Sequence, residues 1–197
     1  MKKYLLIVTA MLLLAPALVS AQRVKLTDGD VDALRGVKKL NVKYDYSDMT
    51  VGKKPEKEYV DEKTVDYNKK EDGKGDKWAQ TWVDDREGRF EPRFEDEFQK
   101  QSDIVLGSFP HEKYTLIIKT TRTEPGYNIG ITRKSAAVDV EAWIVETANQ
   151  SHVIAKISAE NCPGNTMYGA DFDTGERIQD AYGMAGRGIA RYISGHM

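Results

Sequence analysis

Three segments in the second half of the chain alternate between apolar and mostly polar residues. They are residues 114–119, 138–145 and 153–159. A period of two places every second side chain on the same face of a β-strand, so each segment predicts a strand with one apolar face. An apolar sheet face must be covered by another layer of structure. The chain is therefore limited to folds with at least two layers.

A fourth strand is predicted earlier, over residues 40–46. Its apolar positions are Leu40, Val42, Tyr44 and Tyr46. Further along, Pro125-Gly126 marks a turn, and Asn149-Gln150-Ser151 is short enough to connect a hairpin. The last two predicted strands should therefore pair antiparallel.

An aromatic stripe predicts the helices that would cover this sheet. Its members recur mostly four residues apart: Trp78, Trp82, Phe90, Phe94 and Phe98. Residues four apart lie on one helix face, and such a stripe is more typical of a core than of a ligand cage. Pro92 excludes an unbroken helix, so a new helix is expected to begin near Glu91, with Pro92 in its first turn.

The chain should end in a helix. Asp173 is the expected N-cap, and Glu176, three residues on, completes a capping box. The predicted buried face comprises Ile178, Tyr182, Ala185, Ile189 and Tyr192. Gly183 and Gly186 each cost about 1 kcal/mol of helix propensity relative to alanine. Close packing against a neighbouring element, or a kink, would account for them.

These elements follow the order β-α-β-β-β-α. A right-handed crossover would bring the first strand beside a parallel neighbour, with both helices on the one apolar face. We therefore predict an α+β fold, a two-layer open-faced sandwich with about four strands in a mixed sheet. Residues 22–197 would form a single domain. Within it, residues 53–77 are highly charged but neutral, which predicts a solvated helix or a mobile insertion that breaks at Gly73 and Gly75.

Residues 1–21 have the pattern of a secretory signal peptide. Lys2 and Lys3 precede an apolar run, and Val19-Ser20-Ala21 fits a cleavage site. The run is short for a membrane span, so we expect no transmembrane segment after cleavage. The expected location is extracytoplasmic, either periplasmic or secreted. Cys162 is the single cysteine, which excludes an internal disulfide framework and a multi-cysteine metal site.

The charge balance excludes one class of partner. The chain has 29 Lys and Arg residues against 31 Asp and Glu, a formal net charge of −2. A nucleic-acid-binding domain is expected to be basic. We therefore expect no nucleic-acid partner.

The sheet face opposite the helices contains four apolar residues among charged ones. They are Ile117, Trp143, Val145 and Ile154. A partly exposed apolar patch of this kind often marks a binding surface. Cross-strand pairs on a solvated sheet face give the same pattern, so a purely local structural role is the alternative.

Several short motifs suggest chemistry but fit structural roles better. Asp173-Thr174-Gly175 matches the triplet of aspartic proteases, yet it occurs once and precedes a helix. Residues 28–32 are rich in aspartate, but a calcium-binding loop that starts at Asp28 would need glycine at its sixth position and glutamate at its twelfth, where the chain has Ala33 and Lys39. Residues 183–188 contain three glycines inside the final helical pattern rather than between a strand and a helix. We therefore assign no metal, no cofactor and no catalytic residue.

Cys162 could be considered as a catalytic nucleophile, but it lies in a turn sequence. His111 and His152 are scattered, and nothing in the sequence lowers the pKa of the thiol. A cysteine hydrolase is not favoured.

Parts of the chain show a resemblance. The runs Tyr114-Thr-Leu-Ile-Ile-Lys-Thr-Thr and Asp180-Ala-Tyr-Gly-Met-Ala-Gly, with residues 124–130, 145–149 and 189–193, resemble secreted proteins of unknown function from Bacteroides-type bacteria. The predicted topology also resembles small envelope modules, namely the lipopolysaccharide-assembly lipoprotein and the amino-terminal domain of TolB. This resemblance implies a place in the cell envelope and no known activity, since a fold does not fix a function.

Two functions follow as hypotheses. The first is a non-catalytic extracytoplasmic module that binds an envelope protein or another envelope component through the open sheet face. The alternative is a secreted hydrolase that uses surface carboxylates, either Asp139 with Glu141 or Asp171 with Asp173. The sequence assigns neither the ligand nor the oligomeric state.

Overall fold

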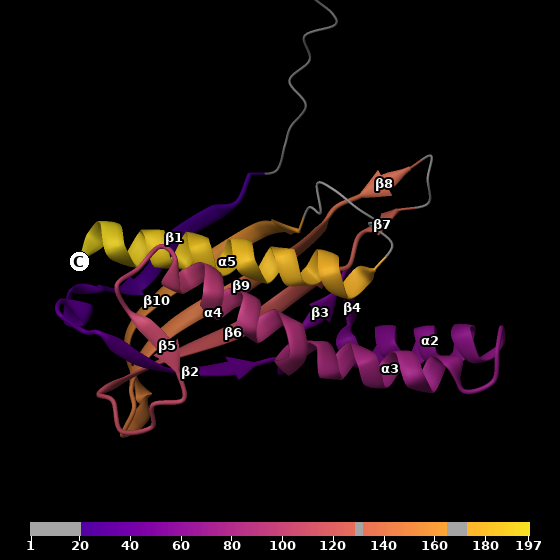
Figure 1. The fold of residues 1–197 in the computed structure, drawn as a ribbon, viewed down its shortest axis with the longest axis horizontal. Helices are drawn as coiled ribbons and strands as arrows, with labels where there is room; N and C mark the ends of the chain where they lie inside the picture. The colour runs from indigo at the N-terminus through magenta and orange to yellow at the C-terminus, as the bar shows by residue number, and fades with distance from the viewer. Residues whose placement is uncertain (1–20, 129–131, 165–172) are drawn as a thin grey trace, which may run out of the picture.

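The protein combines one large β-sheet with helices that lie along one of its faces (Figure 1). The computed structural model describes residues 21–128, 132–164 and 173–197. Eight strands of these residues form the sheet, in the order β1-β10-β9-β6-β2-β5, with β3 beside β6 and β4 paired with β3. The strands are β1 (Arg23–Gly29), β2 (Lys39–Asp45), β3 (Thr50–Val51), β4 (Lys54–Pro55), β5 (Val105–Gly107), β6 (Tyr114–Glu124), β9 (Ala136–Glu146) and β10 (Asn149–Gly164). The prediction of about four strands was therefore too low. A separate ribbon pairs β7 (Tyr127–Asn128) with β8 (Arg133–Lys134).

The four predicted strands correspond to β2, β6, β9 and β10. β2 pairs parallel with β6, as the crossover prediction requires, and β9 pairs antiparallel with both β6 and β10. The β9–β10 hairpin turns at residues 147–148, slightly before the predicted turn, because β10 already begins at Asn149. The antiparallel pairing of the last two strands is confirmed.

One long helical run carries the aromatic stripe. It consists of α3 (Lys74–Asp85), a π-helical turn (Arg86–Phe90) and α4 (Glu91–Gln99). The start of α4 at Glu91, with Pro92 in its first turn, is confirmed, and the α-helix is interrupted by a π-helical turn rather than by a non-helical break. The N–H of Glu91 donates to the carbonyl of Arg86, five residues back. This wider turn makes room for the ring of Pro92, which would clash with a carbonyl in an ordinary α-helical turn.

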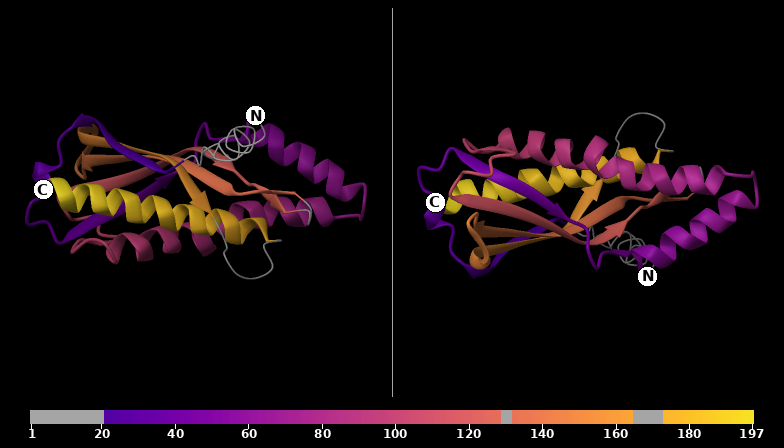
Figure 2. Two further views of the ribbon diagram at one scale, coloured as in Figure 1. Left: turned by 90° about the horizontal axis from the view of Figure 1, so that it is seen from above. Right: turned by 90° about the horizontal axis from the view of Figure 1, so that it is seen from below.

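The final helix α5 (Thr174–His196) lies beside α4 on the same face of the sheet (Figure 2). Asp173 is its N-cap, as predicted, and accepts a hydrogen bond of 2.7 Å from the N–H of Gly175. Four of the five predicted face residues are buried, while Tyr192 is half-buried and Ile193 is buried instead. The glycines of residues 183–188 lie inside this helix. None of the helices in the described ranges is long and apolar enough to cross a membrane.

Gly186 accounts for the close approach of α4 and α5. A Cβ atom at this position would lie 2.3 Å from the carbonyl oxygen of Phe94. The backbone of α4 therefore occupies the space that a side chain would need. Of the two explanations offered for the helix glycines, close packing is the one that the structure supports.

The core lies between the helices and the covered face of the sheet, which we call the inner face. Leu116, Val140 and Ile157 belong to one buried cluster with Phe94 and Tyr182. The Tyr182 ring stacks on Phe90 with centroids 5.1 Å apart, and its hydroxyl lies 2.6 Å from the Thr120 hydroxyl. The buried hydroxyl of Tyr182 thus has a hydrogen-bond partner, Thr120, on the inner face of the sheet.

The charged segment of residues 53–77 extends from the end of this body as a helical hairpin (Figure 1). Its first helix is α2 (Glu56–Asn68), none of whose residues is buried, and its second is the start of α3. Gly73 precedes α3 with a φ of +73°, a conformation that glycine adopts readily. The Trp78 ring packs against Tyr59 and Tyr67 and joins the two helices.

Candidate functional site

The outer sheet face, away from the helices, places two of the predicted binding residues together. Ile117 is directly opposite Trp143 in the β6–β9 pair, and both are half-buried. Lys156 flanks Trp143 on the other side, with its ammonium 4.1 Å from the ring centroid. The indole N–H of Trp143 donates to Glu141 over 2.9 Å.

The other two predicted residues lie apart from this centre. Val145 is fully buried, next to the buried Thr115, which bonds both Asn41 and Thr147. Ile154 lies at a register irregularity of β10 and packs partly against the core. The exposed part of the predicted surface is therefore centred on Ile117 and Trp143, and its role in binding stays a prediction.

The carboxylates proposed for a hydrolase have structural partners. Asp139 pairs with the Arg122 guanidinium at 2.6 and 3.0 Å and accepts the N–H of Asn161 at 2.7 Å. Glu141 accepts from Trp143. Asp171 lies outside the described residues, and Asp173 caps α5. Asp139 thus accepts three hydrogen bonds and forms an ion pair with Arg122.

Asp173 is held in its charged form. Burial opposes this charge, but the Arg89 guanidinium at 2.8 Å and the N–H of Gly175 hold the pKa of Asp173 below its ordinary value. A general acid needs the opposite shift. The aspartic-protease interpretation of Asp173-Thr174-Gly175 therefore has no support in this geometry.

Cys162 is buried on β10, where the side-chain amide of Gln22 lies 3.4 Å from its sulfur. Burial raises the pKa of the thiol to about 12. His152 is one of the two histidines considered as a base. Its Nδ1 instead lies 3.2 Å from a carboxylate oxygen of Glu146. The thiol therefore has no activating partner of this kind among the described residues.

We expect Cys162 to resist alkylation in the folded protein. A rise in pKa from an ordinary thiol to about 12 lowers the thiolate fraction on the order of a thousandfold at pH 8. Iodoacetamide labelling, followed by mass spectrometry, should be slow in buffer and fast in concentrated urea. Equal labelling rates in both would show that the thiol is accessible and ionised in the native state.

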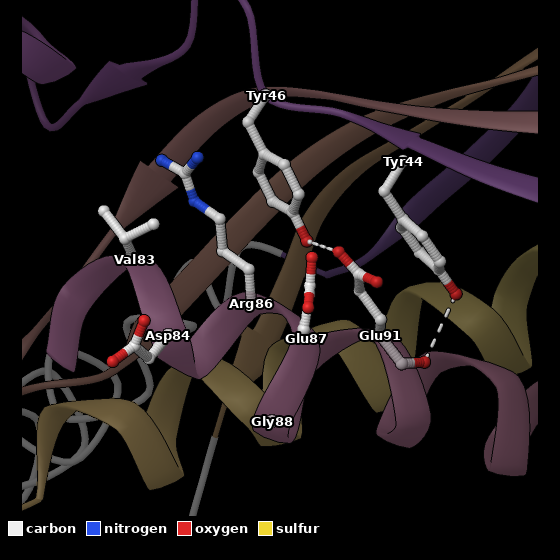
Figure 3. A pocket seen from close by; sticks show the side chains of 8 residues that line it. All are labelled: Tyr44, Tyr46, Val83, Asp84, Arg86, Glu87, Gly88 and Glu91. Atoms are coloured by element: carbon white, nitrogen blue, oxygen red, sulfur yellow. Dashed lines mark hydrogen bonds between the residues drawn. The ribbon is translucent and has the colours of Figure 1, made fainter. Parts of the chain in front are cut away.

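A groove with a volume of about 620 Å³ lies between β2 and the helical run. Strand alternation places Tyr44 and Tyr46 on the inner face near the end of β2, where no described strand pairs with the chain on the side away from β6. The π-helical turn and the start of α4 form the opposite wall. Figure 3 shows the two tyrosines extending from β2 toward this wall, with Glu91 between them.

The tyrosine hydroxyls tie the two walls together. Tyr46 donates to a carboxylate oxygen of Glu91 over 3.2 Å. Tyr44 donates over 3.2 Å to the main-chain carbonyl of Glu91 or to the carboxylate of Glu95. Burial, together with these carboxylates, raises the pKa of both tyrosines, so they stay protonated donors.

Arg86 is the one cation among the described residues that line the groove, and it is already engaged. Its guanidinium lies 4.4 Å from the Tyr46 ring centroid and 2.6 Å from a Glu56 carboxylate oxygen. The same oxygen of Glu56 accepts the indole N–H of Trp82 over 2.7 Å. Arg86 therefore forms its ion pair with Glu56, although its charge also acts on Glu91.

Three carboxylates remain on the groove wall: Asp84, Glu87 and Glu91. Glu87 has no hydrogen bond or ion pair with any described residue, and Asp84 accepts only from the Gln80 side chain. Burial raises the pKa of Glu91, and the negative charges of Glu87 and Glu95 raise it further, against the hydrogen bond from Tyr46 and the positive charge of Arg86. The groove thus has an excess of negative charge beside two aromatic rings.

Among the residues that the structure describes, no three His, Cys, Asp or Glu side chains are grouped to hold a metal. The groove instead offers carboxylates and aromatic faces, which attract organic cations.

Comparisons with known proteins add little to this description. No known family model matches the chain. No curated protein matches it either. Among solved structures, it is similar to PelC from Paraburkholderia phytofirmans, a dodecamer, at 11% identity over 84% of this chain and 96% of PelC, with a TM-score of 0.40. A PelC variant matches at 11% identity over 83% and 97%, with a TM-score of 0.35. Similarity this weak carries no inference about function.

Proposed function

We propose that the protein is a non-catalytic binding module whose ligand presents a cationic group to the groove between β2 and the π-helical turn. The observation that carries this proposal is the uncompensated carboxylate of Glu87, beside Asp84 and Glu91, while Arg86 is paired with Glu56. Like charges that lie close together repel, and a bound cation relieves that repulsion. The adjacent tyrosine rings would add a favourable contact with an ammonium or guanidinium group.

A binding role also agrees with the occupied carboxylates elsewhere in the molecule. Asp139 and Asp173 each pair with an arginine, which favours binding over the alternative of a secreted hydrolase. The sequence of residues 1–21 supports a location outside the cytoplasm. The ligand would then be a component of the envelope or of the surrounding medium.

The test is a titration of the 15N-labelled protein with N-acetyl-lysine amide, a probe that carries a single cationic side chain. We expect amide shifts at Glu87 and Gly88 that saturate in the millimolar range. Glu87→Gln should weaken binding about two- to fivefold, the range typical of one exposed charge contact. Affinity should also fall as the pH is lowered through the raised pKa of Glu91, because a protonated carboxyl no longer attracts the cation.

Asp72→Asn is the matched control. Asp72 is an exposed acid in the turn between α2 and α3, so this variant has the same net charge as Glu87→Gln without altering the groove. Unchanged affinity in Glu87→Gln would contradict the proposal. Loss of binding in Trp143→Lys, with shifts around Ile117, would place the site on the outer face instead.

A further inference from the structure

The edge of the sheet beside the groove is open. β5 pairs with β2 only at Lys39, Leu40 and Asn41, whereas β2 continues to Asp45. On the side of β2 away from β6, no described strand pairs with the chain beyond Asn41. The groove lies directly alongside this stretch, since Tyr44 forms part of its wall.

The open edge presents backbone donors and acceptors. The carbonyl of Lys38 accepts the N–H of Val105, which identifies the side of the strand that faces β5. In a parallel sheet, alternate residues turn both their N–H and C=O groups to the same side. Leu40, Val42 and Tyr44 therefore direct their backbone groups toward β5. The pairing of Asn41 with Gly107 uses the N–H of Val42, so the C=O of Val42 and both backbone groups of Tyr44 lie at the edge beyond the end of β5.

We infer that a short, extended and basic segment of a partner polypeptide adds to this edge as a strand, in line with β5, and that the groove takes its inward-facing side chains. The inference rests on the proposed cation site and names the class of partner that would use it. Strand addition gives affinity through main-chain hydrogen bonds and specificity through alternate side chains.

Charge complementarity favours a basic segment over other occupants. Side chains on one face of an added strand would repeat about every 6.6 Å and point toward the layer that contains Asp84, Glu87 and Glu91. Lysine or arginine at every second position would place cations beside these carboxylates. An acidic segment would add like charges to a groove that already has an excess of them.

Lys43 opposes unspecific pairing at this edge. It is exposed on the outer face of β2, and a charged residue on an edge strand opposes indiscriminate pairing with other sheets. We therefore expect this edge not to pair with every exposed strand. The acidic groove would favour a strand with basic side chains.

The test compares two peptides with the sequence Ac-Lys-Val-Lys-Val-Lys-NH2, one unmodified and one methylated at every backbone nitrogen. Methylation removes the backbone donors but keeps the side chains and their charges. We expect the unmodified peptide to bind the full chain about tenfold or more tightly than the methylated one. It should also slow hydrogen exchange at the amide of Tyr44, while the amide of Val42, already paired with β5, should change little. A peptide of the same composition with its three lysines consecutive should bind more weakly than the alternating one.

The outcomes separate this inference from the proposed function. If both peptides bind equally, and Glu87→Gln weakens both, strand addition is overturned while the cation site stands. If peptide binding protects amides of β1 instead, the assigned edge is wrong. If neither peptide nor N-acetyl-lysine amide binds, both proposals fail together.

Discussion

Replacing Gly186 by alanine is expected to destabilise the protein by about 2–3 kcal/mol, although alanine is the better helix former. In an uncrowded helix this change would stabilise by up to about 1 kcal/mol. Here the new Cβ would lie 2.3 Å from the carbonyl oxygen of Phe94, a backbone atom that cannot move aside without separating α4 from α5. Overpacking of this kind costs about 1–3 kcal/mol and sometimes more. Urea unfolding, followed by far-UV circular dichroism, measures the difference.

Gly195→Ala is the control for this prediction. Gly195 lies in the same helix, and a Cβ there would have no neighbour within 4 Å. This variant should be as stable as the original protein or slightly more so. A Gly186→Ala variant that matched it would show that α4 and α5 do not touch at this point.

Truncating Phe94 to alanine should cost about 3–5 kcal/mol, the range for a large aromatic side chain removed from a core. Phe94 is fully buried, and its ring packs against Tyr44 and Phe98, with centroids 6.1 and 6.3 Å away. The variant leaves a cavity below the groove as well as between the layers. Thermal and urea unfolding should both show the loss.

The exposed Val65 on α2 provides the comparison. It is 53% exposed and outside the core, so Val65→Ala should change the free energy of unfolding by less than about 0.5 kcal/mol. A similar small change in Phe94→Ala would mean that the helical layer does not rest on the sheet as described.

The sequence predicted those parts of the fold whose side-chain patterns are long. β6, β9 and β10 each span eleven residues or more, and the period-two pattern of their apolar residues follows from having one face buried. Asp173 was predictable as an N-cap because its side chain acts on its own helix. An N-cap depends only on residues that are close in the sequence, so it can be predicted without knowing the contacts between distant segments.

The missed strands are short or lie at the edge. β3, β4 and β5 contain two or three residues each, too few to show a period. β1 does alternate, but it has only Val24 and Leu26 as apolar residues. Its place in the sheet depends on main-chain pairing with β10, and main-chain pairing leaves little trace in side-chain composition.

The groove was hidden for a related reason. Tyr44 and Tyr46 were assigned to the apolar face of a strand, and they do face inward, but none of the strands that the structure describes pairs with the chain beside them on the side away from β6. Glu87 and Glu91, four residues apart before and beside Pro92, were the available signal. Their position relative to β2 depends on the π-helical turn, which no residue pattern in this chain predicts.

That π-helical turn also determines the direction of the α2–α3 hairpin. Each residue of an α-helix advances the chain by about 100° around the axis, so one additional residue in a turn rotates everything before it by roughly that angle. Without it, Trp82 would turn away from the body and the hairpin would emerge on a different side. Inserting or deleting one residue between Arg86 and Phe90 would therefore change the direction in which the α2–α3 hairpin extends, without changing the strand order of the sheet.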